Sequence, residues 1–287
     1  MTRALPLPSG LVGALVVALL GCGPPPPPAP PPRAGSHMDR AVWTGDVSEE
    51  EFARLHRLST AEVPPLRGES VELDDGSRAY LSLPEGDAPH PAVLVIHEWW
   101  GLNANIRHWT DRLAADGYAA LAVDLYAGRT ATNPDVAIQL MREVDDAAAL
   151  RTLEAATRFL DADPRVRAPR RAVIGWCFGG GWSLGTGVAI PGYSAVVMYY
   201  GRPITDVERL RALQSPLLAI FGNRDTSIPP PRVDEFDRAL NEAGVPHRIL
   251  RFDAVHAFAN PSSDHYDPAS ATAAWDAVRA QLAEALR

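Results

Sequence analysis

Short apolar runs alternate with longer amphipathic segments from about residue 91 to the carboxyl terminus. The short runs predict strands, and segments in which apolar residues recur every three or four positions predict helices. The expected strands are 91–97, 118–123, 171–176, 193–199, 215–222 and 247–252. The expected helices are 104–116, 134–162, 180–189, 204–213, 230–244 and 267–286. This alternation predicts an α/β fold, with a mostly parallel sheet and helices on both faces.

Two smaller elements are expected before these. Residues 71–73 and 78–83 predict a hairpin, because Asp74, Asp75 and Gly76 between them favour a turn. A capping box begins at Ser48 and predicts a short helix that ends near residue 58.

The amino-terminal segment has the character of an export signal. Arg3 precedes an apolar stretch, 11–20, which is too short to span a bilayer. The stretch ends two residues before Cys22 and resembles a bacterial lipoprotein signal, which implies cleavage and lipidation at Cys22. An ordinary secretory signal is the alternative, and an uncleaved hydrophobic anchor is a third interpretation.

Residues 23–32 hold eight prolines, and such a run favours an extended, semi-rigid spacer. We therefore divide the chain into a signal peptide (1–21), a lipid-anchor cysteine with a proline-rich linker (22–40) and a single α/β domain (41–287). This organisation predicts an extracytoplasmic lipoprotein that contacts a bacterial membrane only through its lipid anchor.

The net charge and the cysteine content of the chain argue against some kinds of binding partner and against a disulfide bond. The 287 residues carry a formal charge of −8, which argues against nucleic-acid binding, and no basic patch suggests a membrane surface site. With Cys22 lipidated, Cys177 is the one remaining cysteine and no disulfide can form. We expect a monomer.

The most informative motif surrounds Cys177. Gly175 and Gly179 flank it two positions away on either side, directly after an expected strand and before an expected helix. This spacing is typical of a sharp turn that exposes a nucleophile above a sheet. The alternative is that Cys177 is a small buried hydrophobic residue.

Residues suited to assist a nucleophile follow in the order that this motif requires. Asp225 comes just after the strand 215–222, and His256 comes after the strand 247–252. Histidine can take the thiol proton, and aspartate can orient the imidazole. The alternatives are a turn aspartate that caps a helix and a packed loop histidine.

The strand 91–97 leads into His97, Glu98, Trp99 and Trp100. A loop in this position supplies one backbone N–H of an oxyanion hole, and the residue after the nucleophile supplies the other. We therefore expect the N–H groups of Trp99 and Phe178 to bind an oxyanion. A zinc motif would need histidine at position 101, where the chain has glycine, so we expect neither a metal nor a cofactor.

Together these segments resemble the dienelactone hydrolase (carboxymethylenebutenolidase) family. The matching segments are 95–103, 123–126, 175–181, 221–225 and 256–260. The resemblance implies an α/β-hydrolase fold and a triad of Cys177, Asp225 and His256. It also implies that Glu98 helps to deprotonate the thiol, although Glu98 could instead pair with a nearby cation.

The substrate site departs from the family pattern. Family members hold a substrate carboxylate with two arginines, but Arg129 is displaced by one position and Asn260 stands at the second place. Arginine binds carboxylates in a bidentate way and asparagine does not. We assign substrate contacts to Arg129, Asn260 and three aromatic residues, Trp100, Tyr200 and Phe258, which could alternatively be core residues.

These observations predict a cysteine-dependent hydrolase of lactones or small carboxylic esters that acts through an acyl-thioester. A broader carboxylesterase or thioesterase is the first alternative. A catalytically silent surface-binding lipoprotein is the second.

Overall fold

The computed structural model describes Met1 and residues 65–287. The chain divides into two compact units, Met1–Gly35 and Ser36–Arg287, and every helix and strand described below belongs to the second unit. The predicted signal peptide, linker, lipidated Cys22 and short helix 48–58 lie outside the described residues. The domain boundary at residue 41 also stays a prediction.

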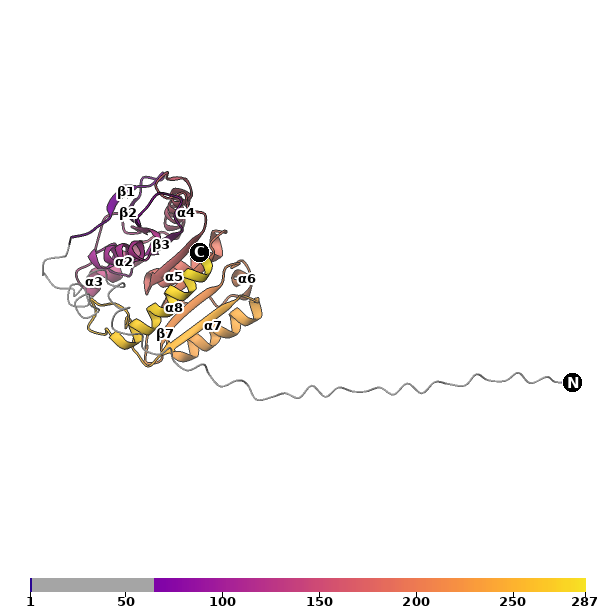
Figure 1. Cartoon of the computed structure of the whole chain (residues 1–287). Helices are drawn as coiled ribbons and strands as arrows, with labels where there is room; N and C mark the ends of the chain where they lie inside the picture. The colour runs from indigo at the N-terminus through magenta and orange to yellow at the C-terminus, as the bar shows by residue number, and fades with distance from the viewer. Residues whose placement is uncertain (2–64) are drawn as a thin grey trace. The chain divides into compact units, whose positions relative to one another are not determined.

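A sheet lies at the centre of the second unit (Figure 1), and its strand order is β1-β2-β4-β3-β5-β6-β7-β8. The bounds are β1 (Glu69–Glu72), β2 (Arg78–Ser82), β3 (Ala92–Ile96), β4 (Ala119–Val123), β5 (Arg171–Trp176), β6 (Ala195–Tyr199), β7 (Leu217–Gly222) and β8 (His247–Phe252). Strand β2 is antiparallel to β1 and β4, and the other pairs are parallel. The predicted hairpin and the mostly parallel sheet are confirmed.

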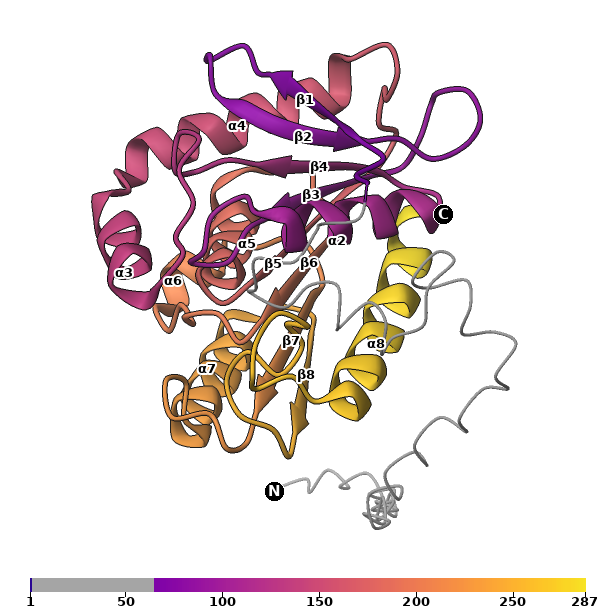
Figure 2. The same cartoon turned by 90° about the vertical axis from the view of Figure 1, so that its left-hand side faces the viewer.

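Helices cover both faces of the sheet. Their bounds are α2 (Ala104–Ala115), α3 (Pro134–Glu143), α4 (Asp146–Ala162), α5 (Phe178–Ala189), α6 (Val207–Leu210), α7 (Pro230–Ala243) and α8 (Pro268–Leu286). Helices α2 and α8 pack on one face, and α4, α5 and α7 lie on the other (Figure 2). Because both faces are covered, strands such as β3, β4 and β6 are buried at every position. Their continuous apolar runs follow from this burial.

The helix predicted over 134–162 is in fact two helices. The backbone of Val144 is extended (φ −66°, ψ 118°) and ends α3. The Asp145 side chain then accepts a hydrogen bond from Ala148 N at 2.7 Å and caps the start of α4. A side chain that satisfies a free N–H in this way favours a new helix start over continuation of the previous helix.

The helix predicted over 204–213 is much shorter than expected. Only Val207–Leu210 forms α6, because the Asp206 side chain accepts from Arg209 N at 3.1 Å and fixes the helix start. Asp206 itself is extended, with ψ at 110°, so the residues before it do not join the helix.

The predicted catalytic residues all follow the carboxyl ends of parallel strands. Glu98 follows β3, Cys177 follows β5, Asp225 follows β7 and His256 follows β8. The carboxyl ends of parallel strands meet at one edge of the sheet, where ligands of open α/β sheets bind. Within residues 65–287, no helix combines the length and the apolar character needed to cross a bilayer.

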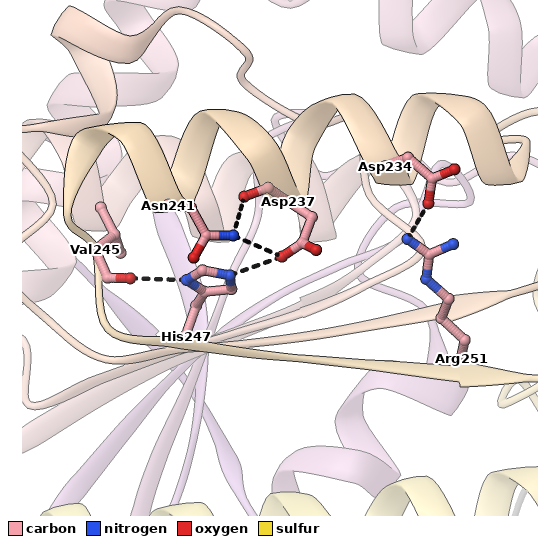
Figure 3. Close-up of polar contacts among 6 residues, drawn as sticks. All are labelled: Asp234, Asp237, Asn241, Val245, His247 and Arg251. Atoms are coloured by element: carbon pink, nitrogen blue, oxygen red, sulfur yellow. Dashed lines mark hydrogen bonds and ion pairs between the residues drawn. The ribbon is translucent and has the colours of Figure 1, made fainter. Parts of the chain in front are cut away.

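The opposite edge holds a polar cluster with a structural role. His247 begins β8 and joins it to α7, with Nε2 at 2.9 Å from Asp237 Oδ1 and Nδ1 at 2.7 Å from the Val245 carbonyl oxygen (Figure 3). Asn241 donates to the Asp237 carbonyl oxygen at 2.8 Å. The His247 side chain is only 10% exposed, whereas Asp234, which pairs with Arg251, is 55% exposed.

We expect His247→Ala to lower the free energy of unfolding by about 1–3 kcal/mol, because it leaves the Val245 carbonyl and the Asp237 carboxylate without this partner. Urea denaturation near neutral pH measures the loss. The matched control is Asp234→Ala, which breaks the exposed pair with Arg251 and should cost no more than about 0.5 kcal/mol. Equal losses in the two variants would contradict a special role for His247.

Candidate active site

Cys177 occupies the sharp turn that the sequence predicted between β5 and α5. Its backbone has φ 53° and ψ −114°, a conformation that residues with a side chain rarely adopt. The turn is held because Cys177 N donates to the Tyr199 carbonyl oxygen at 3.0 Å, and Gly181 N donates to the Cys177 carbonyl oxygen at 3.2 Å. The sulfur therefore projects from the carboxyl edge of the sheet, where its side chain is half-buried.

The flanking glycines are required by close backbone contacts. A Cβ on Gly175 would lie 2.1 Å from the Gly179 carbonyl oxygen, and a Cβ on Gly179 would lie 2.2 Å from the Ile96 carbonyl oxygen. Both distances are too short for any side chain. The amino end of α5 thus packs directly against the end of β3, and the turn at Cys177 is set by this contact.

The structure brings Cys177, His256 and Asp225 into one line of hydrogen bonds. His256 Nε2 lies 3.3 Å from Cys177 Sγ, and His256 Nδ1 lies 2.7 Å from Asp225 Oδ2. The other Asp225 oxygen, Oδ1, accepts from Ser227 N at 2.7 Å and from Ile228 N at 2.9 Å. Asp225 is buried, so these donors fix its carboxylate and, through it, the imidazole.

These contacts favour a positively charged His256. Burial opposes the charge, but the hydrogen bonds and charges of Asp225 and Cys177 outweigh burial and raise the pKa of His256 to about 10. For Asp225, burial likewise opposes ionisation, and the bonds from His256, Ile228 and Ser227 lower its pKa. An imidazolium beside a sulfur is an arrangement that stabilises a thiolate.

Glu98 is a second buried carboxylate with a different environment. It is 3% exposed, and burial raises its pKa to about 7, although the charge of His256 and the Tyr200 hydroxyl act to lower it. Its Oε2 accepts from Asn260, but its Oε1 and the Tyr200 hydroxyl both lack a partner in hydrogen-bond geometry. Glu98 Oε1 therefore accepts no hydrogen bond of good geometry from the described residues.

Asn260, predicted to contact substrate, lies against Glu98. It is 2% exposed, and its Nδ2 donates to Glu98 Oε2. Its Oδ1 accepts from Asn105 Nδ2 at 3.2 Å, Ser262 N at 2.8 Å and Ser262 Oγ at 2.5 Å. The Ser262 N–H can only donate, so it fixes the orientation of the Asn260 amide. The sequence showed the position of Asn260 but not these partners, and Asn105 and Ser262 were not predicted at all.

The three aromatic residues assigned to substrate, together with the adjacent Trp99, fall into two groups. Phe258 and Tyr200 are 0% and 1% exposed, and their rings pack together with centroids 5.6 Å apart. The Tyr200 ring also lies 5.0 Å from the His256 ring, so the two residues form a buried wall behind the imidazole. Trp99 and Trp100 are half-buried, and the centroids of their rings lie 4.8 Å apart. Both residues belong to the loop that follows β3.

Arg129 is exposed and already paired. Its Nη1 lies 2.6 Å from Glu143 Oε2, and its Nε donates to the Tyr126 carbonyl oxygen at 3.3 Å. The pair ties the segment after β4 to the end of α3. A substrate carboxylate would have to compete with Glu143 for this guanidinium.

The predicted oxyanion donors are available. Neither Trp99 N nor Phe178 N donates a hydrogen bond to any described residue. Phe178 is the first residue of α5, where backbone N–H groups have no acceptor in the helix and the helix dipole favours negative charge. Residues 65–287 contain no cluster of three or more histidine, cysteine or acidic residues that could hold a metal.

Comparison with known proteins assigns the chain to a protein family. The sequence profile of the dienelactone hydrolase family matches residues 77–286. The chain belongs to the dienelactone hydrolase family. The resemblance drawn from the sequence motifs is confirmed, and so is the α/β-hydrolase fold. Members of this family hydrolyse carboxylic esters or lactones, and the chain is an enzyme of that kind.

Individual dienelactone hydrolase relatives agree with the profile. A Synechocystis protein named "Putative carboxymethylenebutenolidase" is 31% identical over 70% of this chain and 88% of its own length. A Bradyrhizobium protein named "Probable 2-oxo-3-(5-oxofuran-2-ylidene)propanoate lactonase" is 28% identical over 69% of this chain and 85% of its own. Among solved structures, a dienelactone hydrolase-like promiscuous phosphotriesterase from metagenomic libraries superposes with a TM-score of 0.69 at 27% identity, covering 77% of this chain and 98% of its own.

We expect kcat/KM for ester hydrolysis to rise with pH through about 7, because Glu98 can accept a proton only when it is ionised. Glu98→Gln should remove this rise and lower kcat/KM by about 10- to 100-fold. Initial rates from about pH 5 to about pH 9 test the expectation. A Glu98→Gln enzyme that keeps the wild-type pH profile would contradict it.

A stability measurement serves as the control for this variant. Burial raises the pKa of Glu98 above its ordinary value of 4.5 to about 7, so ionising it costs stability progressively as pH rises between these values. Glutamine carries no such cost. The variant should therefore have a higher Tm than wild type at pH 8 and no advantage at pH 4, which separates a lost proton acceptor from a damaged fold.

Proposed function

We propose that this enzyme hydrolyses lactones or small carboxylic esters with Cys177 as nucleophile, through an acyl-thioester intermediate. The observation that carries the proposal is the unbroken line of hydrogen bonds from Cys177 through His256 to Asp225. A nucleophile, a base and a residue that orients the base are the parts that such a reaction needs.

The first half of the reaction forms the thioester. The Cys177 sulfur attacks the carbonyl carbon of the substrate, and the carbonyl oxygen becomes an oxyanion. The N–H groups of Trp99 and Phe178 stabilise that oxyanion. When the tetrahedral intermediate collapses, the carbon–oxygen ester bond breaks and the leaving oxygen takes a proton from His256.

The second half regenerates the enzyme. His256 takes a proton from water, and the resulting hydroxide attacks the thioester carbon. The carbon–sulfur bond then breaks, the carboxylic acid leaves and the sulfur is free again. Asp225 stabilises the imidazolium in both halves, and Glu98 accepts the thiol proton before the first attack.

A broader ester specificity is a second candidate. Neither candidate for a carboxylate-binding group is free: Arg129, one position away from the family's first arginine, pairs with Glu143, and Asn260, at the place of the second, is buried and bonded to Glu98. A neutral ester would not require either group. This arrangement supports turnover of uncharged esters over carboxylated lactones.

Side-by-side assays test both proposals. We expect the full-length chain in detergent to hydrolyse p-nitrophenyl acetate, and Cys177→Ala to reduce turnover by at least about 1,000-fold. Cys177→Ser serves as the matched variant, because it keeps the shape of the site and weakens the nucleophile. Full activity in Cys177→Ala would refute the cysteine mechanism. A higher kcat/KM for a carboxylated dienelactone than for the neutral ester would refute the broader specificity.

We also propose that the enzyme works outside the cytoplasm and is anchored by lipid at Cys22. The proposal is supported by Arg3, the apolar stretch 11–20 and the cysteine that follows it. Wild-type chain expressed in a bacterium should incorporate labelled fatty acid and sediment with membranes. Cys22→Ala should do neither. Unlabelled wild-type protein in the soluble periplasmic fraction would favour an ordinary secretory signal instead.

A further inference from the structure

His97 is a buried histidine that the proposed mechanism does not use. It directly follows β3 and is 0% exposed, next to the catalytic Glu98. Its Nδ1 lies 2.6 Å from the Glu98 carbonyl oxygen, and Leu125 N donates to its Nε2 at 3.1 Å. Both ring nitrogens therefore bond to the backbone, one on each side of the ring.

These partners determine the protonation of His97. The Leu125 N–H can only donate, so Nε2 carries no proton, and the Glu98 carbonyl can only accept, so Nδ1 carries one. The ring is neutral. Burial, which lowers the pKa of His97, acts in the same direction.

The bond to the Glu98 carbonyl also fixes the direction of the Trp99 N–H. The two groups belong to one planar peptide unit and point to opposite sides of it. The same carbonyl oxygen accepts a second bond from Gly101 N at 3.1 Å, which closes the turn. Gly101 has φ +87°, and a Cβ there would lie 2.7 Å from the Arg129 carbonyl oxygen, so the turn admits only glycine.

His97 also contacts the segment that supplies the other oxyanion donor. Its ring stacks on the Phe178 ring with centroids 5.7 Å apart and an interplanar angle of 17°. A Cβ on Gly179 would lie 2.5 Å from the His97 carbonyl oxygen. His97 thus hydrogen-bonds to the peptide unit that contains the Trp99 N–H, and its ring packs against Phe178, whose N–H is the second donor.

We propose that neutral His97 is a positioning residue for the oxyanion hole, which holds the Glu98–Trp99 peptide so that the Trp99 N–H points at the substrate oxygen. This inference rests on the proposed function. It adds a role for the Nδ1–H of His97 that is separable from the triad.

Two substitutions that each remove one hydrogen bond form a matched pair. In His97→Asn the side-chain Nδ2 takes the place of Nδ1, so the bond to the Glu98 carbonyl is kept and the bond from Leu125 is lost. In His97→Gln the side-chain oxygen takes the place of Nε2, so the bond from Leu125 is kept and the bond to Glu98 is lost. Both variants lose the same number of bonds, and only one loses the bond that the proposal requires.

We expect His97→Gln to lower kcat for p-nitrophenyl acetate by about 10- to 100-fold with KM changed by less than about threefold, and His97→Asn to stay within about threefold of wild type. A second measurement uses two reagents for Cys177. The sulfur adds to the carbonyl carbon of a trifluoromethyl ketone and forms an oxyanion, whereas it displaces iodide from iodoacetamide without forming one. His97→Gln should weaken ketone binding by the same factor as kcat and leave the alkylation rate within about twofold.

Equal effects of the two variants, or an equal loss of ketone binding and alkylation, would overturn the inference. A wild-type enzyme that neither hydrolyses the ester nor binds the ketone would instead overturn the proposed function. In that case the backbone ¹⁵N resonance of Trp99 decides the role of His97, because the nitrogen shares a peptide unit with the Glu98 carbonyl. The resonance should shift in His97→Gln and stay unchanged in His97→Asn, and any other pattern would refute the role.

Discussion

Backbone packing between the end of β3 and the start of α5 is the constraint on which the site depends. Glycine at positions 175 and 179 lets the chain turn within van der Waals contact of the Ile96 carbonyl. Cys177, which lies between these two glycines, has a positive φ of 53°, and neither Phe178 N nor Trp99 N donates a hydrogen bond to a described residue. One contact between main chains thus fixes the start of α5, directly after Cys177, against the end of β3, directly before His97 and Glu98.

The site contains two buried carboxylates whose surroundings give them opposite tendencies. Asp225 accepts three hydrogen bonds, from His256, Ser227 and Ile228, and its pKa is lowered in spite of burial. Glu98 accepts one bond from a neutral amide, and burial raises its pKa to about 7. When the surroundings shift the pKa values of two carboxyl groups in opposite directions, the two groups can serve as acid and base in different steps. The surroundings therefore favour the charged form of Asp225 and the protonated form of Glu98.

The neutral character of Asn260 matters for this division. An arginine beside Glu98 would hold the carboxylate ionised, because an opposite charge within a few ångströms favours the charged form. Asparagine holds the Glu98 oxygen in place without supplying a charge, so the proton affinity that burial creates is kept. The neutral amide of Asn260 is therefore compatible with the raised pKa of Glu98, the residue that we propose primes the thiol.

The sequence predicted the parts of the site that follow from strand ends. Cys177, Asp225 and His256 each come after a short apolar run, and parallel strands bring their carboxyl ends together. The contacts of Asn260 could not be predicted in this way, since spacing along a loop does not show which way a side chain points. The break at Val144 was missed because apolar periodicity continues across it, and only the capping side chain of Asp145 marks the new start.

His97 shows the same limit most clearly. Its type and place suggested a metal ligand, and the absence of a second histidine at 101 removed that interpretation. Its actual partners are backbone groups, one of them on the segment after β4, which only the folded sheet brings near. A charged imidazole could not accept from Leu125, so the fold requires one histidine of the site to be neutral while the other, His256, is held positive by Asp225 and Cys177. The two rings lie in one site with opposite protonation states, and the hydrogen-bond partners of each ring favour its state: backbone groups for His97, and Asp225 and Cys177 for His256.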